Sequence, residues 1–140
     1  MYAVVLDVNV LLSSLITKGK PRELWLKARD RQLTLILSDQ IVSELVNVVS
    51  RGKFARYVTE NDIRVFLEAL HRTARFTKVR SRFKVVKQDP DDDIILRTAH
   101  DSTANYIVSG DKHLLSLGEF RGMKIVTVDE MLKLLRKGKE

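Results

Sequence analysis

The sequence predicts an α/β domain in which helices cover both faces of a parallel sheet. Short runs of apolar, branched residues alternate along the chain with segments of helical periodicity, which is typical of parallel sheets. The length of 140 residues is that of one domain. Only two prolines and six glycines occur, and no repeat, low-complexity tract or linker divides the chain. We therefore expect residues 1–140 to form a single domain.

Apolar periodicity and capping residues set the expected elements. Strands are expected at residues 3–7, 33–37, 105–108 and 123–126, with short candidates at 76–79 and 83–86. Helices are expected at residues 8–16, 21–32, 38–50, 59–75, 89–101, 111–117 and 128–137. The helix at 59–75 follows another helix instead of a strand, so we expect it to form an arm or lid at one end of the domain.

The charge of the chain indicates a polyanionic partner. The formal net charge is +7, from 25 Lys and Arg against 18 Asp and Glu, and nucleic acid is the commonest partner of a basic domain. Heat-adapted proteins also carry lysine-rich surfaces, so an excess of basic residues alone is a weak indication of nucleic-acid binding. Its distribution says more, because bases dominate residues 18–31, 51–56 and 72–87, whereas acids concentrate at 89–93. An acidic pocket ringed by basic surface suits cleavage of a phosphate polymer.

The composition also excludes several classes of protein. Without cysteine, the chain has neither a disulfide framework nor a thiolate zinc site. No apolar run approaches the roughly 20 residues that cross a bilayer, and no basic stretch precedes the first strand. We therefore expect a cytoplasmic protein with no membrane segment and no signal peptide.

Four acidic residues lie where an apolar run gives way to a helical pattern: Asp7, Glu44, Asp92 and Asp111. In an open parallel sheet such positions gather at the carboxyl ends of the strands, where ligands bind. Carboxylates gathered there repel one another unless a divalent cation holds them. The leading prediction is therefore a metal-dependent enzyme.

Each acid also has a structural explanation. Asp7 and Asp111 can simply cap the helices that follow them, and Glu44 can be a solvated residue at the edge of an apolar stripe. Asn9, two residues after Asp7, adds a second oxygen ligand of the kind that a hard cation prefers. A lone histidine such as His113 beside such a turn is more often an exposed polar residue than a ligand.

The segment Asp89 to Asp93 carries four acids in five residues. Acids in the first turn of a helix gain about 0.3–1 kcal/mol each from the helix dipole, but four exceed what capping needs. Helical periodicity places Asp92 on the side of Leu96, toward the sheet, and Asp93 on the polar side with Arg97. Asp92 is thus the better ligand candidate, and Asp93 a possible partner of the ligands.

The ordered set of motifs resembles the PIN-domain family. It consists of Val5-Leu6-Asp7-Val8-Asn9-Val10-Leu11, Ser43-Glu44-Leu45, Asp89-Pro90-Asp91-Asp92-Asp93 and Val108-Ser109-Gly110-Asp111-Lys112. The resemblance covers nearly the whole chain and is strongest to the single-domain prokaryotic branch, related to the toxins of VapC-type toxin–antitoxin pairs.

The resemblance implies a three-layer α/β/α sandwich and a nuclease that cuts single-stranded or structured RNA with Mg²⁺ or Mn²⁺. Matched motif by motif, the acidic quartet of metal ligands and catalytic groups would be Asp7, Glu44, Asp92 and Asp111. Asn9 and Ser109 would lie beside them. Many members have an acid where this chain has His113, which could weaken a second metal site, or supply a proton donor or a phosphate contact instead. An antitoxin partner is also implied.

A hydrolytic mechanism follows as a hypothesis. A metal-bound water would attack the phosphorus, and Glu44 could orient or deprotonate that water. Bases of the segments 51–56 and 72–87 would hold the RNA backbone, among them Arg51, Lys53 and Arg56, and Arg97 could reach the scissile phosphate. Such binding should weaken steeply with salt.

Two other classes of function remain open. The domain could be a non-catalytic RNA- or protein-binding module with a degenerate metal site, which need not take up Mn²⁺ in calorimetry. A phosphoacceptor signalling domain would need paired acids after the first strand, and Val8-Asn9 lacks that pair. Apolar surface on the expected arm could serve a homodimer.

Overall fold

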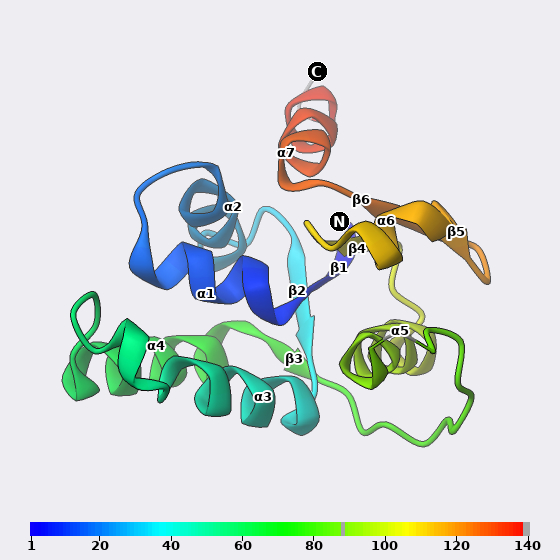
Figure 1. Cartoon of the computed structure of the whole chain (residues 1–140). Coiled ribbons are helices and arrows are strands. Elements are labelled where there is room, and N and C mark those ends of the chain that lie inside the picture. Colours follow the sequence, from blue (N-terminus) through cyan, green and yellow to red (C-terminus); the bar gives the residue numbers. More distant parts are fainter. Residues whose placement is uncertain (88, 139–140) are drawn as a thin grey trace.

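A single sheet forms the centre of the domain in the computed structural model, which describes residues 1–87 and 89–138. Its strand order is β3-β2-β1-β4-β6-β5 (Figure 1). The strands are β1 (Ala3–Leu6), β2 (Thr34–Leu37), β3 (Arg75–Phe76), β4 (Tyr106–Val108), β5 (Glu119–Phe120) and β6 (Met123–Val126). The middle strands β1, β2 and β4 are almost entirely apolar and largely buried, as expected for strands that helices cover on both faces.

The predicted parallel sheet is confirmed for five of these strands, because β3, β2, β1, β4 and β6 run parallel to their neighbours. The sixth strand, β5, was not predicted and pairs antiparallel with β6. Arg121 and Gly122 join the two strands with φ angles of 48° and 86°. Positive φ at both loop residues is the hairpin geometry that suits the twist of the strands. Two residues of strand are too short to leave a pattern in the sequence.

Helices connect the strands and form the two outer layers. They are α1 (Val8–Ile16), α2 (Lys20–Arg29), α3 (Asp39–Val49), α4 (Glu60–Thr73), α5 (Pro90–Ser102), α6 (Lys112–Leu117) and α7 (Val128–Lys137), with a 3₁₀ turn, η1 (Gly52–Phe54). The helix α1 packs on α2 and α3, and α2 also contacts α4 and α7, whereas α5 lies against β1, β2 and β4. The three-layer α/β/α architecture is therefore confirmed.

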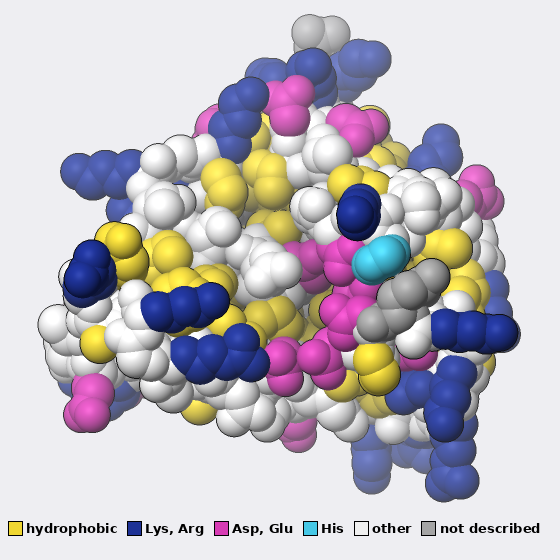
Figure 2. All heavy atoms as spheres, viewed as in Figure 1, with side chains coloured by type: hydrophobic (Ala, Val, Ile, Leu, Met, Phe, Trp, Pro, Cys, Tyr) yellow, Lys and Arg dark blue, Asp and Glu magenta, His cyan; other side chains and the backbone are white. Residues whose placement is uncertain are grey.

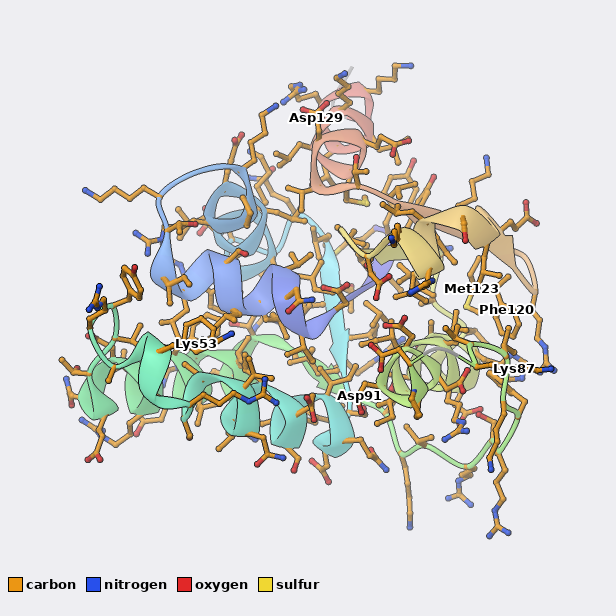
Figure 3. All side chains as sticks on the ribbon, viewed as in Figure 1. Lys53, Lys87, Asp91, Phe120, Met123 and Asp129 are labelled. Carbon is orange, nitrogen blue, oxygen red and sulfur yellow. The ribbon has the colours of Figure 1, made fainter. Side chains whose placement is uncertain are left out.

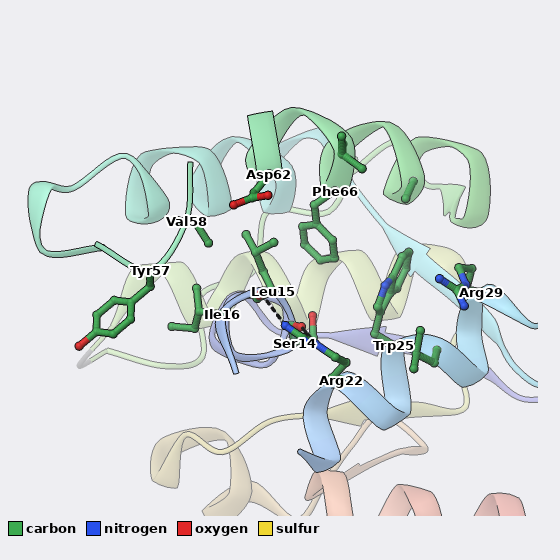
Figure 4. Close-up of a pocket in the computed structure, with 13 residues that line it drawn as sticks. Ser14, Leu15, Ile16, Arg22, Trp25, Arg29, Tyr57, Val58, Asp62 and Phe66 are labelled. Atoms are coloured by element: carbon green, nitrogen blue, oxygen red, sulfur yellow. Dashed lines mark hydrogen bonds between the residues drawn. The ribbon is translucent and has the colours of Figure 1, made fainter. Parts of the chain in front are cut away.

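The helix α4, which was expected as an arm or lid at one end of the domain, also contributes side chains to the core. Together with α3 it forms the connection from β2 to β3, and it packs along α2. Phe66 of α4 meets Trp25 of α2 edge to face, with ring centroids 5.3 Å apart, and Leu70 is fully buried. A groove of about 550 Å³ remains between α1, α2 and α4, with Tyr57 at one end (Figure 4).

The segment between β3 and α5 departs most from prediction. The strand expected at 76–79 is reduced to Arg75–Phe76, and residues 83–86 form no strand. The reason lies in their hydrogen bonds, because the backbone N–H groups of Ser81, Val85 and Val86 bond to side chains of α5 instead of a neighbouring strand. We call residues 78–87 the strap, since they wrap around α5 (Figure 1).

Candidate metal centre

The candidate site lies where the strand order reverses. From β1 the chain connects outward to β2 on one side, and β4 lies on the other side, so the carboxyl ends of β1 and β4 flank a crevice. Open α/β sheets bind ligands at such a switch point. Asp7 directly follows β1 and Ser109 directly follows β4. Their placement is fixed by the sheet, since the N–H of Asp7 donates to the carbonyl of Val108 at 3.1 Å.

Six carboxylates line one cavity of about 290 Å³ at this crevice. They come from the loops after β1 and β4, from α3 and from the start of α5: Asp7, Glu44, Asp89, Asp91, Asp92 and Asp111. Figure 2 shows acidic side chains gathered in a cluster at the middle of this face, with basic side chains on either side. The structure therefore brings together all four members of the expected acidic quartet.

Three of these acids are close enough to share one ion. Asp89, Asp92 and Asp111 each offer a carboxylate oxygen, and these oxygens lie within 4.8 Å of one another. Such a group of oxygen ligands suits Mg²⁺ or Mn²⁺, which keep several waters as further ligands. The acidic triad Asp89, Asp92 and Asp111 can therefore hold a divalent cation.

Asp92 provides the strongest test of whether a cation fits. Its side chain is 7% exposed, and its Oδ2 is buried with no hydrogen-bond partner among the described residues. Burial, followed by the neighbouring Asp111 carboxylate, raises the pKa of Asp92 to about 8. A buried carboxylate oxygen with no donor is costly, and a cation would remove that cost. The donor set of this site therefore fits a metal.

Asp7 is the most buried of the cavity carboxylates, at 4% exposure. Its Oδ1 accepts a hydrogen bond from the N–H of Val10 at 2.9 Å, so it caps α1 as the alternative explanation proposed. Its Oδ2 accepts a hydrogen bond from Ser109. Burial raises the pKa of Asp7, with the charge of Asp111 adding to it, while the bonds from Ser109 and Val10 oppose the rise. Capping and a place in the cavity are therefore compatible.

Ser109 connects two of the acids. Its side chain is fully buried, and its Oγ donates to Asp7 while accepting from the N–H of Asp111 at 2.9 Å. One hydroxyl group thereby fixes the carboxylate after β1 relative to the loop after β4. The expected place of Ser109 beside the acids agrees with this geometry.

Glu44 lines the cavity from α3 but lies outside the triad. It is half-buried, as expected for a residue at the edge of the apolar stripe of α3. Burial raises the pKa of Glu44, the charge of Asp91 adds to this, and Arg51 opposes it. A carboxylate with a raised pKa beside a metal site is a candidate proton acceptor.

Asp89 is the ligand candidate that the sequence did not single out. Its Oδ1 accepts a hydrogen bond from the N–H of Asp91 at 3.0 Å, so Asp89 caps α5. In the sequence, this capping role alone was enough to explain an acid at position 89. A carboxylate has two oxygens, however, and Asp89 can cap the helix while it contributes to the triad. The available signal was the surplus of acids in the segment 89–93.

Asn9 and His113 were both expected beside the acids, but only Asn9 lines the cavity. Asn9 is exposed and lines the cavity. His113 is half-buried on α6 and is not among the cavity-lining residues, although its N–H donates to Oδ1 of Asp111 at 2.7 Å. The backbone of His113, not its ring, therefore holds Asp111 in place.

Asp93 was expected on the polar face of α5 as a possible partner of the metal ligands, but its partners are backbone groups of the strap. It is 3% exposed, because the strap covers that face of α5. Its Oδ1 accepts hydrogen bonds from the N–H groups of Val85 at 2.9 Å and Val86 at 3.0 Å. Asp93 shares a face with Arg97 as predicted, but its carboxylate fastens the strap and does not line the cavity.

The bases divide into two groups. Arg51 and Lys53 line the cavity, and Arg56 is exposed nearby in the chain without lining it. Figure 3 places Lys53 to one side of Asp91 and Lys87 to the other. Arg97 does not reach the site, because its Nε and Nη2 donate to the carbonyl of Phe83 at 2.8 and 2.6 Å. Arg97 therefore holds the strap and does not line the cavity, contrary to the expected contact with a scissile phosphate.

The fold and the site together define an α/β domain with a carboxylate cavity at the switch point of its sheet. The chain belongs to the PIN-domain family, since the family model described as "PIN domain" matches residues 3–113. PIN domains are generally nucleases that use divalent metals. This finding confirms the resemblance on which the sequence interpretation rested.

A comparison with solved structures confirms the fold independently. The chain is similar to a chain in the crystal structure of VapBC2 from Rickettsia felis bound to a DNA fragment from their promoter, with a TM-score of 0.59 and 12% sequence identity. The match covers 89% of this chain and 98% of that one. A search of the curated proteins gave no match. None of the described helices combines the length and apolar character needed to span a bilayer.

Proposed function

We propose that this protein is a Mg²⁺- or Mn²⁺-dependent endoribonuclease that hydrolyses phosphodiester bonds of RNA. The observation that carries the proposal is the convergence of Asp89, Asp92 and Asp111, whose oxygens lie within 4.8 Å, around a buried Asp92 oxygen with no donor. Membership of a family of nucleases supports it. The net charge of +7 favours an anionic substrate such as RNA.

The carboxylates have distinct roles in this proposal. Asp89, Asp92 and Asp111 hold the cation, with Asp7 beside them. The bound cation supplies the Lewis-acid chemistry that activates water and offsets the charge developing on a phosphate. Ser109 keeps Asp7 and the loop of Asp111 in register through its two hydrogen bonds.

Glu44 is proposed as the group that orients the attacking water and takes its proton. It lines the same cavity and lies outside the group of three acids whose oxygens are within 4.8 Å of one another. Burial and the neighbouring charge of Asp91 raise the pKa of Glu44, which makes its carboxylate a better proton acceptor. Arg51 and Lys53 line the cavity beside it and are proposed to hold the phosphate backbone, with Arg56 further along the chain.

Cleavage of a single-stranded, end-labelled RNA tests the proposal. Wild-type protein should cleave it with Mg²⁺ or Mn²⁺ and not with EDTA. Asp92→Asn and Asp7→Asn should each lower the rate by about 100-fold or more while the circular dichroism spectrum stays unchanged. Asp30→Asn, an exposed acid after α2, is the matched control and should retain full activity. Full activity in either cavity variant would refute the assignment of the site.

A non-catalytic binding module is the alternative. It would bind RNA or a protein without metal, and calorimetry with Mn²⁺ would then show no heat from the wild-type protein. The cavity geometry favours the enzyme, because a binding module gains nothing from a buried carboxylate oxygen that lacks a donor.

We further propose that the protein acts in the cytoplasm as the toxin of a toxin–antitoxin pair. The likeness to VapBC2, solved together with promoter DNA, supports a DNA-binding antitoxin as partner. A homodimer is proposed through the groove between α1, α2 and α4, at which Tyr57 and Val65 are exposed. A neighbouring reading frame for a small DNA-binding protein, and the mass of the purified protein in solution, test these two statements separately.

A further inference from the structure

The strap presents an alternating pattern of side chains. Its sequence from Lys78 to Lys87 contains five bases and no acid. The bases Lys78, Arg80, Arg82 and Lys84 are exposed, whereas the intervening residues Val79, Ser81, Phe83 and Val85 are half-buried. A period of two is that of an extended strand, although the strap pairs with no strand of the described chain.

The helix α5 holds the strap extended through three side chains spaced four residues apart. Oδ2 of Asp101 accepts from the N–H groups of Arg80 (2.7 Å) and Ser81 (3.0 Å) and from the hydroxyl of Ser81 (3.0 Å). Arg97 donates twice to the carbonyl of Phe83. Asp93 accepts from the N–H groups of Val85 and Val86.

The spacing of these contacts fixes the geometry of the strap. Four helical residues rise by about 6 Å, and each such step on α5 corresponds to two residues of the strap. Two residues of extended chain span about 6.6 Å, so the strap is stretched almost as far as a β-strand. Asp93, Arg97 and Asp101 of α5 therefore act as a substitute for a partner strand, and the four bases of the strap remain exposed.

The result is an extended row of positive charge. Three intervals of about 6.6 Å separate Lys78 from Lys84, so the row is about 20 Å long. Within residues 1–87 and 89–138, none of the four bases takes part in an ion pair. Arg121 adds a further base next to the strap, since its guanidinium carbon lies 4.5 Å from the centroid of the Phe83 ring. Figure 2 shows basic side chains gathered beside the acidic cluster.

We propose that the strap binds the phosphate backbone of single-stranded RNA and directs the strand into the metal cavity. We call this binding surface the rail. Its end, Lys87, is two residues from Asp89 of the triad. The row is as long as about six phosphates of a duplex strand, which follow one another roughly every 3.4 Å of rise. The inference deepens the proposed nuclease function, because it names the surface that positions the substrate.

An extended row favours a nucleic-acid strand over an acidic protein. Evenly repeated charges along one line match an evenly charged polymer, whereas an acidic protein surface presents charges at irregular spacing. The proposed contacts of the strap are to phosphates and not to base edges. Binding should therefore be independent of the RNA sequence.

The first test compares two variants with the same net charge. One replaces Lys78, Arg80, Arg82 and Lys84 by Gln, and the control replaces four exposed bases elsewhere by Gln: Lys18, Lys124, Arg136 and Lys137. Binding of a fluorescent 12-nucleotide RNA is measured by anisotropy in EDTA over a series of salt concentrations. The strap variant should bind at least about tenfold more weakly, and its log–log salt slope should fall by about 3. An equal loss in both variants, or no loss in the strap variant, would overturn the inference.

The second test separates geometry from charge. Asp101→Ala raises the net charge by one, so charge alone predicts tighter RNA binding. Because the substitution releases Arg80 and Ser81, the rail predicts binding that is about threefold weaker or more. Equal or tighter binding would show that the extended geometry is irrelevant. All four strap substitutions lie at exposed positions, so the first test remains decisive if Asp101→Ala unfolds the protein.

Two further probes identify the ligand and separate the two proposals. A poly-glutamate peptide should bind more weakly than RNA of the same length, and tighter binding that depends on the strap would assign the rail to an acidic protein instead. With Mn²⁺, the strap variant should cleave RNA with a raised KM and an unchanged kcat. Strap-dependent binding without any cleavage would refute only the nuclease. Metal-dependent cleavage with no effect of the strap would refute only the rail.

Discussion

The hydroxyl of Ser109 joins Asp7 to the loop of Asp111, although Ser109 and Asp7 are 102 residues apart in the chain. The two residues directly follow neighbouring parallel strands, β4 and β1, so the sheet itself brings them together. Ser109 is fully buried and has no access to solvent that could replace its hydrogen bonds. The order of the carboxylate cavity therefore depends on one buried hydroxyl group.

Ser109→Ala should weaken metal binding without removing a ligand. Because the bond from Ser109 lowers the pKa of Asp7, its loss should raise that pKa further and leave the carboxylate less often charged. Loss of such a supporting group costs about 10- to 100-fold in metal affinity or activity. The metal concentration for half-maximal RNA cleavage should rise accordingly. Ser116→Ala, on the exposed side of α6, is the control. If RNA cleavage by both variants depended equally on metal concentration, Ser109 would have no role in metal binding.

The contribution of Asp92 to the stability of the metal-free protein should fall as the pH rises from about 4 to about 8. The pKa of Asp92 is raised to about 8 in the folded protein, against about 3.9 in an unfolded chain. Between these values the folded state holds a proton that the unfolded state has lost, so folding is progressively penalised, by at most about 1.4 kcal/mol per pH unit. Below pH 4 the penalty is absent.

Urea unfolding in EDTA across this pH range measures the effect as the difference between wild type and Asp92→Asn. The variant should gain relative stability up to about pH 8 and then level off. Mn²⁺ at pH 8 should cancel the penalty in the wild type and leave the variant almost unchanged. A difference that is constant with pH would show that Asp92 is not a strained carboxylate.

Asp93→Ala should destabilise the protein more than Asp91→Ala, although the two residues are neighbours of the same acidic run. Asp93 is buried and accepts two backbone N–H groups of the strap, and an unsatisfied donor costs about 1–3 kcal/mol. We expect a loss of about 2–3 kcal/mol in the free energy of unfolding. Asp91 is exposed, so its replacement should change stability by less than about 1 kcal/mol. Equal losses in thermal denaturation would contradict the assigned role of Asp93.

The sequence predicted the elements whose signals are local. The apolar run of β1 and the cap at Asp7 lie in neighbouring positions, and both are as predicted. Parallel pairing then follows from the alternation of strands and helices, so the gathering of Asp7, Glu44, Asp92 and Asp111 at one cavity could be foreseen.

The sequence could not predict contacts that depend on an irregular segment. Asp93 and Arg97 were placed correctly on one face of α5, but no periodicity showed that the strap would cover that face. The strap has the alternating pattern of a strand, and only the tertiary structure shows that α5 supplies its hydrogen bonds. Asp89 was missed for a different reason, because capping already explained it and a carboxylate can serve two partners at once.

Binding of Mn²⁺ to the wild-type protein and to Asp92→Asn, measured by calorimetry and by the shift in Tm, tests the central claim most directly. We expect the wild type to bind Mn²⁺ and to gain about 2.7 kcal/mol of stability at a metal concentration 100 times Kd. Asp92→Asn should be more stable than wild type in EDTA and should gain little from the metal. No binding heat in the wild type, or an equal gain of stability in both proteins, would contradict a metal site formed by Asp89, Asp92 and Asp111.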